Sequence, residues 1–304
     1  MRLIVSGASG LIGTALVPAL RAAGHRVGRL VRGAAALSQG DVRWSPAEGA
    51  IDAAGLEGVD GVVHLSGESI FAGLRRWTAA KRVRIRDSRV DTTALLARAI
   101  AGLARRPSVL VLVTGSGFYG DRGDEQLTEE STGGTGFLAD VSRAWEAAAS
   151  PAAAAGVRVV YLRTGLVLDR RGGLLGPLLP LFRIGLGGPI GRGRRFWSWI
   201  AIDDLIGVFR FALESPGLAG PVNTASPNPV TNGEFTRALG RVLARPALIP
   251  VPPFALRLLF GRAAANETML TSARLVPARL LAAGFQFRFP DLEGALRHVL
   301  RRNS

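Results

Sequence analysis

Three glycines near the start of the chain could hold a phosphate group through the protein backbone. Gly7, Gly10 and Gly13 are spaced G-x-x-G-x-x-G, between a short apolar run and a segment with helical periodicity. In such a turn the first glycine allows a tight bend, the second lets a pyrophosphate approach, and the third lets the helix pack closely on the strand. N–H groups at the helix start attract the anion. The turn therefore predicts a dinucleotide site; a tight strand–helix turn without a ligand is the alternative.

The second predicted strand ends without the carboxylate that would favour NAD. An NAD site usually carries Asp or Glu about 20 residues after the glycines, where it binds the ribose 2′-hydroxyl. This chain reads Gly28-Arg29-Leu30-Val31-Arg32-Gly33 there. Arg32, with Arg29 as a second candidate, could form charge-assisted hydrogen bonds with a 2′-phosphate. The sequence therefore predicts NADP as the cofactor; the alternative is that Arg32 is a surface arginine in an arginine-rich chain.

Apolar strands that alternate with helices must position this turn. We expect strands at 2–6, 25–31, 61–65, 109–114 and 157–162, and helices at 11–23, 78–104, 139–155 and 202–213. The apolar character of the strands is continuous, which indicates burial on both faces and hence a parallel sheet. The sequence therefore predicts an α/β fold with a doubly wound parallel sheet, the Rossmann architecture.

A change in composition at about residue 226 predicts a second, smaller domain. Residues 166–200 are rich in Gly, Leu and Arg, and we interpret them as a pocket-lining excursion over the sheet edge. After residue 226, proline-rich turns separate short helical segments. We expect an NADP-binding Rossmann domain over 1–225 and a small, mostly helical C-terminal domain on the substrate side over 226–304.

The composition excludes several kinds of site. With no cysteine and only three scattered histidines, His25, His64 and His298, the chain has no pattern for a metal site. The apolar start is too short for export and no apolar run could span a bilayer, so we expect a cytoplasmic protein without a membrane partner. The net charge of +15 comes from 37 arginines and one lysine, Lys81, spread along the chain. This spread favours a compositional bias over a specific nucleic-acid surface.

Longer segments agree with the glycine turn. They lie at 62–67, 118–120, 199–205 and 221–225. With the turn, they resemble the extended, sugar-nucleotide-epimerase-like branch of the short-chain dehydrogenase/reductase superfamily. Further segments at 76–78, 86–90, 119–125, 137–138, 145–146, 228–232 and 282–285 resemble one atypical subgroup. That subgroup is usually labelled only epimerase family protein and ends in a domain of unknown function. The resemblance implies a Rossmann fold and NADP binding, and leaves the substrate open.

The glycine turn and the ends of the predicted strands supply the expected cofactor contacts. These are Gly7, Ser9, Gly10, Leu11, Ile12, Gly13, Arg32, Leu65, Ser66, Gly67 and Arg163.

The usual catalytic pair of the superfamily is missing. Its chemistry uses a tyrosine, with a lysine four residues later that lowers the pKa of the phenol, to exchange a proton while the nicotinamide exchanges hydride. The corresponding segment, residues 137–143, reads Phe-Leu-Ala-Asp-Val-Ser-Arg and contains neither residue. The only tyrosines are Tyr119 and Tyr161, and Lys81 is far from both in sequence.

Four other residues near predicted strand ends could take part in catalysis. Thr114 and Ser116 lie where such sheets place their ligands. Tyr119 is a candidate proton donor, with packing or a cofactor contact as the alternative. Glu68 could act as a base or contact the nicotinamide ribose; a carboxylate at a helix N-terminus is the alternative.

These residues leave three functions open. We expect an NADP(H)-dependent oxidoreductase or epimerase with a small anionic or sugar-nucleotide-like substrate, whose charge the arginines at 192–195 could bind unless they form a basic surface loop. The alternative is a non-catalytic NADP-binding regulator, favoured by the missing pair. A nucleic-acid binder driven by charge is the third, and its affinity would fall steeply with salt. A small-molecule substrate is the expected partner, and a homodimer is compatible with the sequence.

Overall fold

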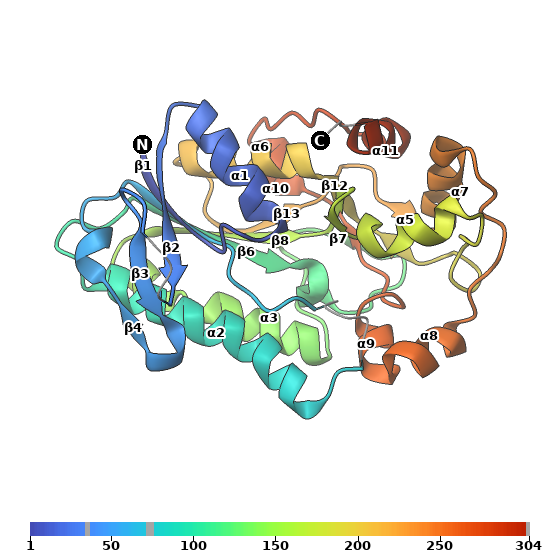
Figure 1. Cartoon of the computed structure of the whole chain (residues 1–304), viewed down its shortest axis with the longest axis horizontal. Coiled ribbons are helices and arrows are strands. Elements are labelled where there is room, and N and C mark those ends of the chain that lie inside the picture. Colours follow the sequence, from blue (N-terminus) through green and yellow to red (C-terminus); the bar gives the residue numbers. More distant parts are fainter. Residues whose placement is uncertain (34–36, 71–75, 302–304) are drawn as a thin grey trace.

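An eight-stranded sheet forms the centre of the computed structural model, which describes residues 1–33, 37–70 and 76–301. The strands are ordered β13-β8-β6-β5-β1-β2-β3-β4 (Figure 1). Their bounds are β1 (Arg2–Ser6), β2 (Arg26–Arg32), β3 (Val42–Ser45), β4 (Ala50–Ile51), β5 (Gly61–His64), β6 (Val109–Gly115), β8 (Arg158–Thr164) and β13 (Gly220–Thr224). All neighbours pair in parallel except β3 with β4. The strand order reverses direction at β1, so the predicted doubly wound α/β architecture is confirmed.

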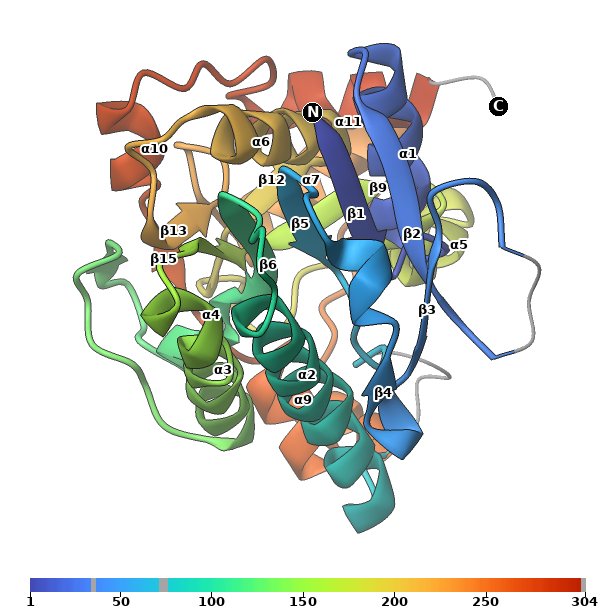
Figure 2. The same ribbon diagram turned by 90° about the vertical axis from the view of Figure 1, so that its left-hand side faces the viewer.

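Helices cover both faces of this sheet. One face is covered by α1 (Leu11–Ala22) and α6 (Ile202–Glu214), and the other by α2 (Ala79–Ala101), α3 (Phe137–Ala147) and α4 (Ser150–Ala154) (Figure 2). Side chains alternate along a strand, so Leu3 and Val5 of β1 pack in the core beneath α1 and α6, while Ile4 packs with α2. The first strand therefore belongs to both cores and is fixed from both sides.

Two predicted helices differ in their limits. The helix expected at 78–104 begins after Thr78, whose hydroxyl caps the N–H of Lys81, and ends at Gly102 rather than farther along the chain. The helix expected at 139–155 is two helices, because Pro151 cannot donate the backbone bond that would continue α3. Proline is instead tolerated in the first turn of α4.

A second core joins the excursion at 166–200 to the C-terminal segment. Its strands are β9 (Leu166–Asp169), β10 (Gly172–Gly173), β11 (Phe196–Trp197), β12 (Trp199–Ala201) and β14 (Val230–Thr231). Its helices are α5 (Leu175–Arg183), α7 (Asn232–Leu243), α8 (Pro253–Phe260), α9 (Arg262–Glu267) and α11 (Leu292–Arg301). Leu179 and Trp199 pack here with Phe235 and Leu296. The division at residue 225 stays a prediction, since residues on both sides of it share this core.

The remaining elements are short connections. They are β7 (Gln126–Leu127), β15 (Arg274–Leu275), α10 (Ala278–Ala282) and the 3-10 helices η1 (Pro46–Glu48), η2 (Ala53–Leu56) and η4 (Ser116–Tyr119). In the described ranges, no helix has the length and apolar character needed to cross a membrane.

Candidate functional site

A cavity of about 670 Å³ lies at the carboxyl ends of β1, β2 and β5, and we call it the glycine-turn cavity. Seven of the expected cofactor residues line it: Gly7, Ser9, Gly10, Arg32, Leu65, Ser66 and Gly67. The candidate catalytic residue Glu68 also lines it. Residues from three separate parts of the sequence thus meet where the strand order reverses, the position at which open α/β sheets bind ligands.

The glycine turn has the close packing that its spacing predicts. Gly7 has φ +62°, and a Cβ there would lie 2.9 Å from the backbone of Leu65. A Cβ on Gly13 would lie 2.4 Å from the carbonyl oxygen of Gly7. Leu11 and Ile12 begin α1, so their N–H groups have no partner within the helix, and no acidic residue stands in its first turn. This helix end can therefore accept a diphosphate.

The two candidate arginines of β2 have different surroundings. Arg29 forms an ion pair with Asp41, at 2.6 Å between Nη2 and Oδ2, and the backbone N–H of Arg29 donates to the same carboxylate. Arg32, at the end of the strand, is exposed and lines the glycine-turn cavity. Arg29 is already neutralised, so of these two candidates Arg32 is the one available to a phosphate.

A buried histidine supports the floor of the cavity from β5. His64 accepts a hydrogen bond at Nδ1 from the Ser6 hydroxyl (2.7 Å), and Nε2 lies 3.3 Å from the Thr92 hydroxyl. Complete burial lowers the pKa of His64 to about 3. His64 is therefore neutral and structural, and it holds β5 to β1 and α2.

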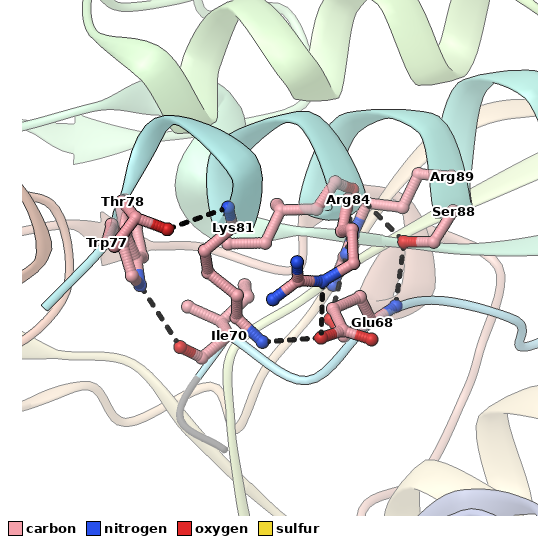
Figure 3. Close-up of polar contacts among 9 residues, drawn as sticks. Glu68, Ile70, Trp77, Thr78, Lys81, Arg84, Ser88 and Arg89 are labelled. Atoms are coloured by element: carbon pink, nitrogen blue, oxygen red, sulfur yellow. Dashed lines mark hydrogen bonds and ion pairs between the residues drawn. The ribbon is translucent and has the colours of Figure 1, made fainter. Parts of the chain in front are cut away.

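Glu68 is held by one face of α2 (Figure 3). Its Oε1 lies 2.7 Å from Nζ of Lys81 and 3.6 Å from Nε of Arg84. Its backbone N–H donates to the Ser88 hydroxyl, and its carbonyl accepts from Arg89. The hydrogen bond from Lys81 is the main reason that the pKa of Glu68 is below its usual value. Glu68 is thus an ionised carboxylate in the cavity wall.

Several wall residues were not predicted. They are Gly33, Trp44, Ser45, Pro46, Ala47, Asp87, Ser88, Asp91 and Thr92. Trp44 reaches the cavity because β3 pairs with β2 and places it opposite Arg32. The short run Val42–Ser45 carries little strand signal by itself, and the α2 residues become neighbours of the cavity only through helix packing. The buried Nε1 of Trp44 makes no hydrogen bond within the described chain.

Two further cavities lie between the sheet and the C-terminal segment. The Ser116 cavity, of about 200 Å³, is lined by Ser116, by the ends of β6 and β8, and by Trp197 and Thr271. It shares Glu267 with a neighbouring cavity of about 280 Å³ that also contains Arg195. Both carboxylate oxygens of Glu267 accept backbone N–H groups at the start of α3, at 2.9 and 2.6 Å. The C-terminal segment therefore helps to build the walls beside Ser116.

The comparisons with known proteins fit this geometry. Residues 3–223 match the NAD dependent epimerase/dehydratase family, and residues 251–299 match a domain of unknown function, DUF1731. The chain belongs to the NAD dependent epimerase/dehydratase family. The expected resemblance to epimerase family proteins with such a C-terminal domain is confirmed.

Relatives of this epimerase family protein come from distant organisms. Epimerase family protein SDR39U1 of Mus musculus is 41% identical over 302 residues, covering 99% of this chain and 100% of the relative. A crystal structure of human SDR39U1 (isoform 2) with NADPH has a TM-score of 0.88 at 38% identity, covering 98% of this chain and 99% of that chain. A nucleoside-diphosphate sugar epimerase from Corynebacterium glutamicum has a TM-score of 0.80 at 36% identity, covering 99% of this chain and 58% of that chain.

Two candidate residues of this epimerase family protein lie in a closed polar network. The Tyr119 hydroxyl lies 2.7 Å from Asn223 Oδ1 and 3.0 Å from the Thr128 carbonyl, both of which are acceptors for its proton. Its oxygen accepts a hydrogen bond from Arg163. Tyr119 is fully buried, and burial raises the pKa of its phenol. Arg163 pairs through two nitrogens with Glu146 at 2.9 and 2.8 Å. This geometry does not support the proton-donor role of Tyr119 or the cofactor contact of Arg163, because neither lines a described cavity.

The other expected residues separate into two groups. The Thr114 hydroxyl is buried and lies 3.3 Å from Glu146, so it belongs to the same network. Ser116 and Glu68 line cavities and remain candidates. In the segment 137–143, which contains neither Tyr nor Lys, Arg143 donates to the Gly134 carbonyl and pairs with Asp140. Within the described residues, no cluster of three or more His, Asp or Glu side chains is suited to a metal ion.

Proposed function

We propose that this chain binds NADP(H) in the glycine-turn cavity and acts as an oxidoreductase or epimerase on a small anionic substrate in the Ser116 cavity. The observation that carries the proposal is the meeting of seven expected cofactor residues, from three strand ends, around one cavity. Helix-end amides suit the diphosphate there, and Arg32 suits a 2′-phosphate. The NADPH in the related human structure supports the same cofactor here.

The surroundings of the Ser116 cavity favour a negatively charged substrate. Arg195 lines both the cavity next to Ser116 and an open groove of about 770 Å³. Arg192, Arg194 and Arg237 also line that groove, together with Asp121 and Asp124. The loop at 192–195, whose arginines we expect to bind a phosphate or carboxylate, thus lies next to the Ser116 cavity. The related C. glutamicum protein is named a nucleoside-diphosphate sugar epimerase, which supports this substrate class.

A screen of NADPH oxidation against carbonyl compounds and sugar nucleotides tests the proposal. For any substrate that turns over, we expect Glu68→Gln and Ser116→Ala to lower kcat/KM by about tenfold or more, as loss of a positioned acid–base or hydrogen-bonding group does. Tyr119→Phe is the control, because its hydroxyl lies outside the cavities. An effect confined to Tyr119→Phe would contradict the proposed site.

A non-catalytic NADP-binding regulator is the second candidate. It is favoured by the closed network around Tyr119 and by the segment 137–143, which contains neither the usual tyrosine nor the usual lysine. This function predicts tight binding of NADPH with no turnover anywhere in the panel. Turnover that depends on Glu68 or Ser116 would exclude it.

A further inference from the structure

Lys81 is the only lysine in the chain, and its position is unusual for a cation. It lies in the first turn of α2, where the free N–H groups make the surroundings positive and where the helix has no acidic residue. The compensating charge comes from outside the helix, from Glu68 at 2.7 Å. The Lys81 side chain is only 12% exposed, so its charge is little screened by water.

The loop after β5 contributes to both the glycine-turn cavity and the Ser116 cavity. Glu68 lines the first and Ile70, two residues later, lines the second. The Trp77 indole N–H donates to the Ile70 carbonyl, so the loop is tied to the start of α2 on this side as well (Figure 3). The Glu68 side chain is 35% exposed, whereas the Lys81 side chain is 12% exposed.

The position of Glu68 relates it to one half of the proposed cofactor. A dinucleotide in a Rossmann sheet extends across the strand-order reversal, with its 2′-substituted ribose at the end of the second strand. Arg32 marks that end. The nicotinamide half must then extend past β5 toward β6, which is the side of Glu68 and Ser116.

The two oxidation states of the cofactor differ by one positive charge on this half. A carboxylate close to the ring stabilises the cationic ring of NADP⁺ and does little for the neutral ring of NADPH. A neighbouring ammonium opposes that effect. Glu68 and Lys81 therefore both affect the ratio of the affinities for NADP⁺ and NADPH, in opposite directions.

We infer that the Glu68–Lys81 ion pair sets the preference of the cavity between oxidised and reduced cofactor. This inference rests on the proposed function. Glu68 is the partner that lines the cavity, and Lys81, which is not among the lining residues, opposes its charge. Arg84, 59% exposed and 3.6 Å from the carboxylate, contributes less. Ser88 and Arg89 hold the backbone of Glu68 and fix the distance.

Calorimetric titration with NADP⁺ and NADPH tests the inference through the ratio of the two dissociation constants. We expect Glu68→Gln to weaken NADP⁺ relative to NADPH by about 3- to 10-fold, and Lys81→Gln to shift the ratio by a similar factor in the opposite direction. Lys81→Arg should restore the ratio to within about twofold, because it keeps the charge. The matched control is Arg26→Gln, which removes one positive charge at the opposite end of β2 and should leave the ratio unchanged.

Each outcome of these titrations is informative. A wild-type protein that binds neither nucleotide removes the proposed function, and the inference with it. A wild-type protein that binds both, with a ratio unchanged in Glu68→Gln and Lys81→Gln, overturns the inference alone.

A second measurement needs no variant. Protein grown with [ε-¹³C]lysine gives a single lysine signal, because Lys81 is the only lysine. We expect its Cε signal to shift differently with saturating NADP⁺ and NADPH. Identical spectra with the two bound nucleotides would contradict the inference.

Discussion

The hydroxyl of Ser6 lies 2.7 Å from Nδ1 of His64, and this contact belongs to a buried network that fixes the tautomer of the histidine. The Thr92 hydroxyl donates to the Ser88 carbonyl, so Nε2 of His64 carries the ring proton and donates to the Thr92 oxygen. Nδ1 therefore accepts from the Ser6 hydroxyl, whose oxygen in turn accepts the N–H of Leu65. The neutral ring joins β1, β5 and α2 directly below the glycine-turn cavity.

This network predicts a loss of stability in mild acid. The pKa of His64 is about 3 in the folded protein and about 6.5 when unfolded, so the unfolded chain binds the proton first. The contribution of neutral His64 to the free energy of unfolding is complete above pH 6.5 and is lost as the pH falls toward 3. We expect the free energy of unfolding to drop by about 2 kcal/mol between pH 8 and 5 from this group. Denaturant unfolding of wild type and His64→Asn should show a smaller pH dependence in the variant; equal dependence would refute the assignment.

Close packing at Gly13 predicts a sensitive backbone position. In Gly13→Ala the new Cβ would meet the Gly7 carbonyl and Ala8 backbone at 2.4–2.7 Å, so α1 must move away from β1. We expect a loss of roughly 1–3 kcal/mol in unfolding free energy and at least about tenfold weaker NADPH binding. Gly176→Ala is the control, because no atom lies within 4 Å of its new Cβ. Unchanged NADPH binding in Gly13→Ala would show that the turn does not hold the diphosphate.

The charge at the end of β2 predicts cofactor selectivity. Arg32→Ala should weaken NADPH binding by about 10- to 100-fold and NADH binding far less, because only NADPH carries the 2′-phosphate. Arg26→Ala, an exposed arginine at the opposite end of the same strand, should leave both affinities unchanged. The two nucleotides are compared by tryptophan fluorescence or calorimetry. Equal losses for both nucleotides in Arg32→Ala would mean that Arg32 does not contact the phosphate.

The closed network around Tyr119 predicts a structural role. Tyr119→Phe removes the phenol that bonds Asn223 Oδ1 and Arg163 Nη1, which should lower the unfolding free energy by about 1–3 kcal/mol. NADPH affinity should stay within about twofold of wild type. Thermal unfolding and titration of the same sample separate the two effects. A variant of normal stability with weakened NADPH binding would reverse this interpretation and return Tyr119 to the site.

The parts predictable from sequence are those set by local geometry. The glycine turn needs only neighbouring residues, because Gly7 and Gly13 relieve contacts within the same turn. The parallel sheet followed from continuously apolar strands. The sequence predicts one helix across α3 and α4, because the alanines around Pro151 have high helix propensity. Pro151 was the local signal for the break between them.

The parts that sequence could not predict depend on distant partners. Tyr119 follows a strand end, as a catalytic residue would, yet Asn223 and Arg163 close around it from β13 and β8. The spacing of Lys81 in the sequence did not indicate a functional role, because its partner Glu68 lies on a loop rather than on the same helix. In both cases the tertiary fold, not the local motif, decides what the side chain contacts.

Titration of the purified wild-type chain with NADPH and NADH tests the central claim most directly. The account predicts saturable binding of NADPH, at least about tenfold tighter than NADH, since one charge-assisted phosphate contact separates them. Absence of binding by either nucleotide to the folded protein, or tighter binding of NADH, would contradict it.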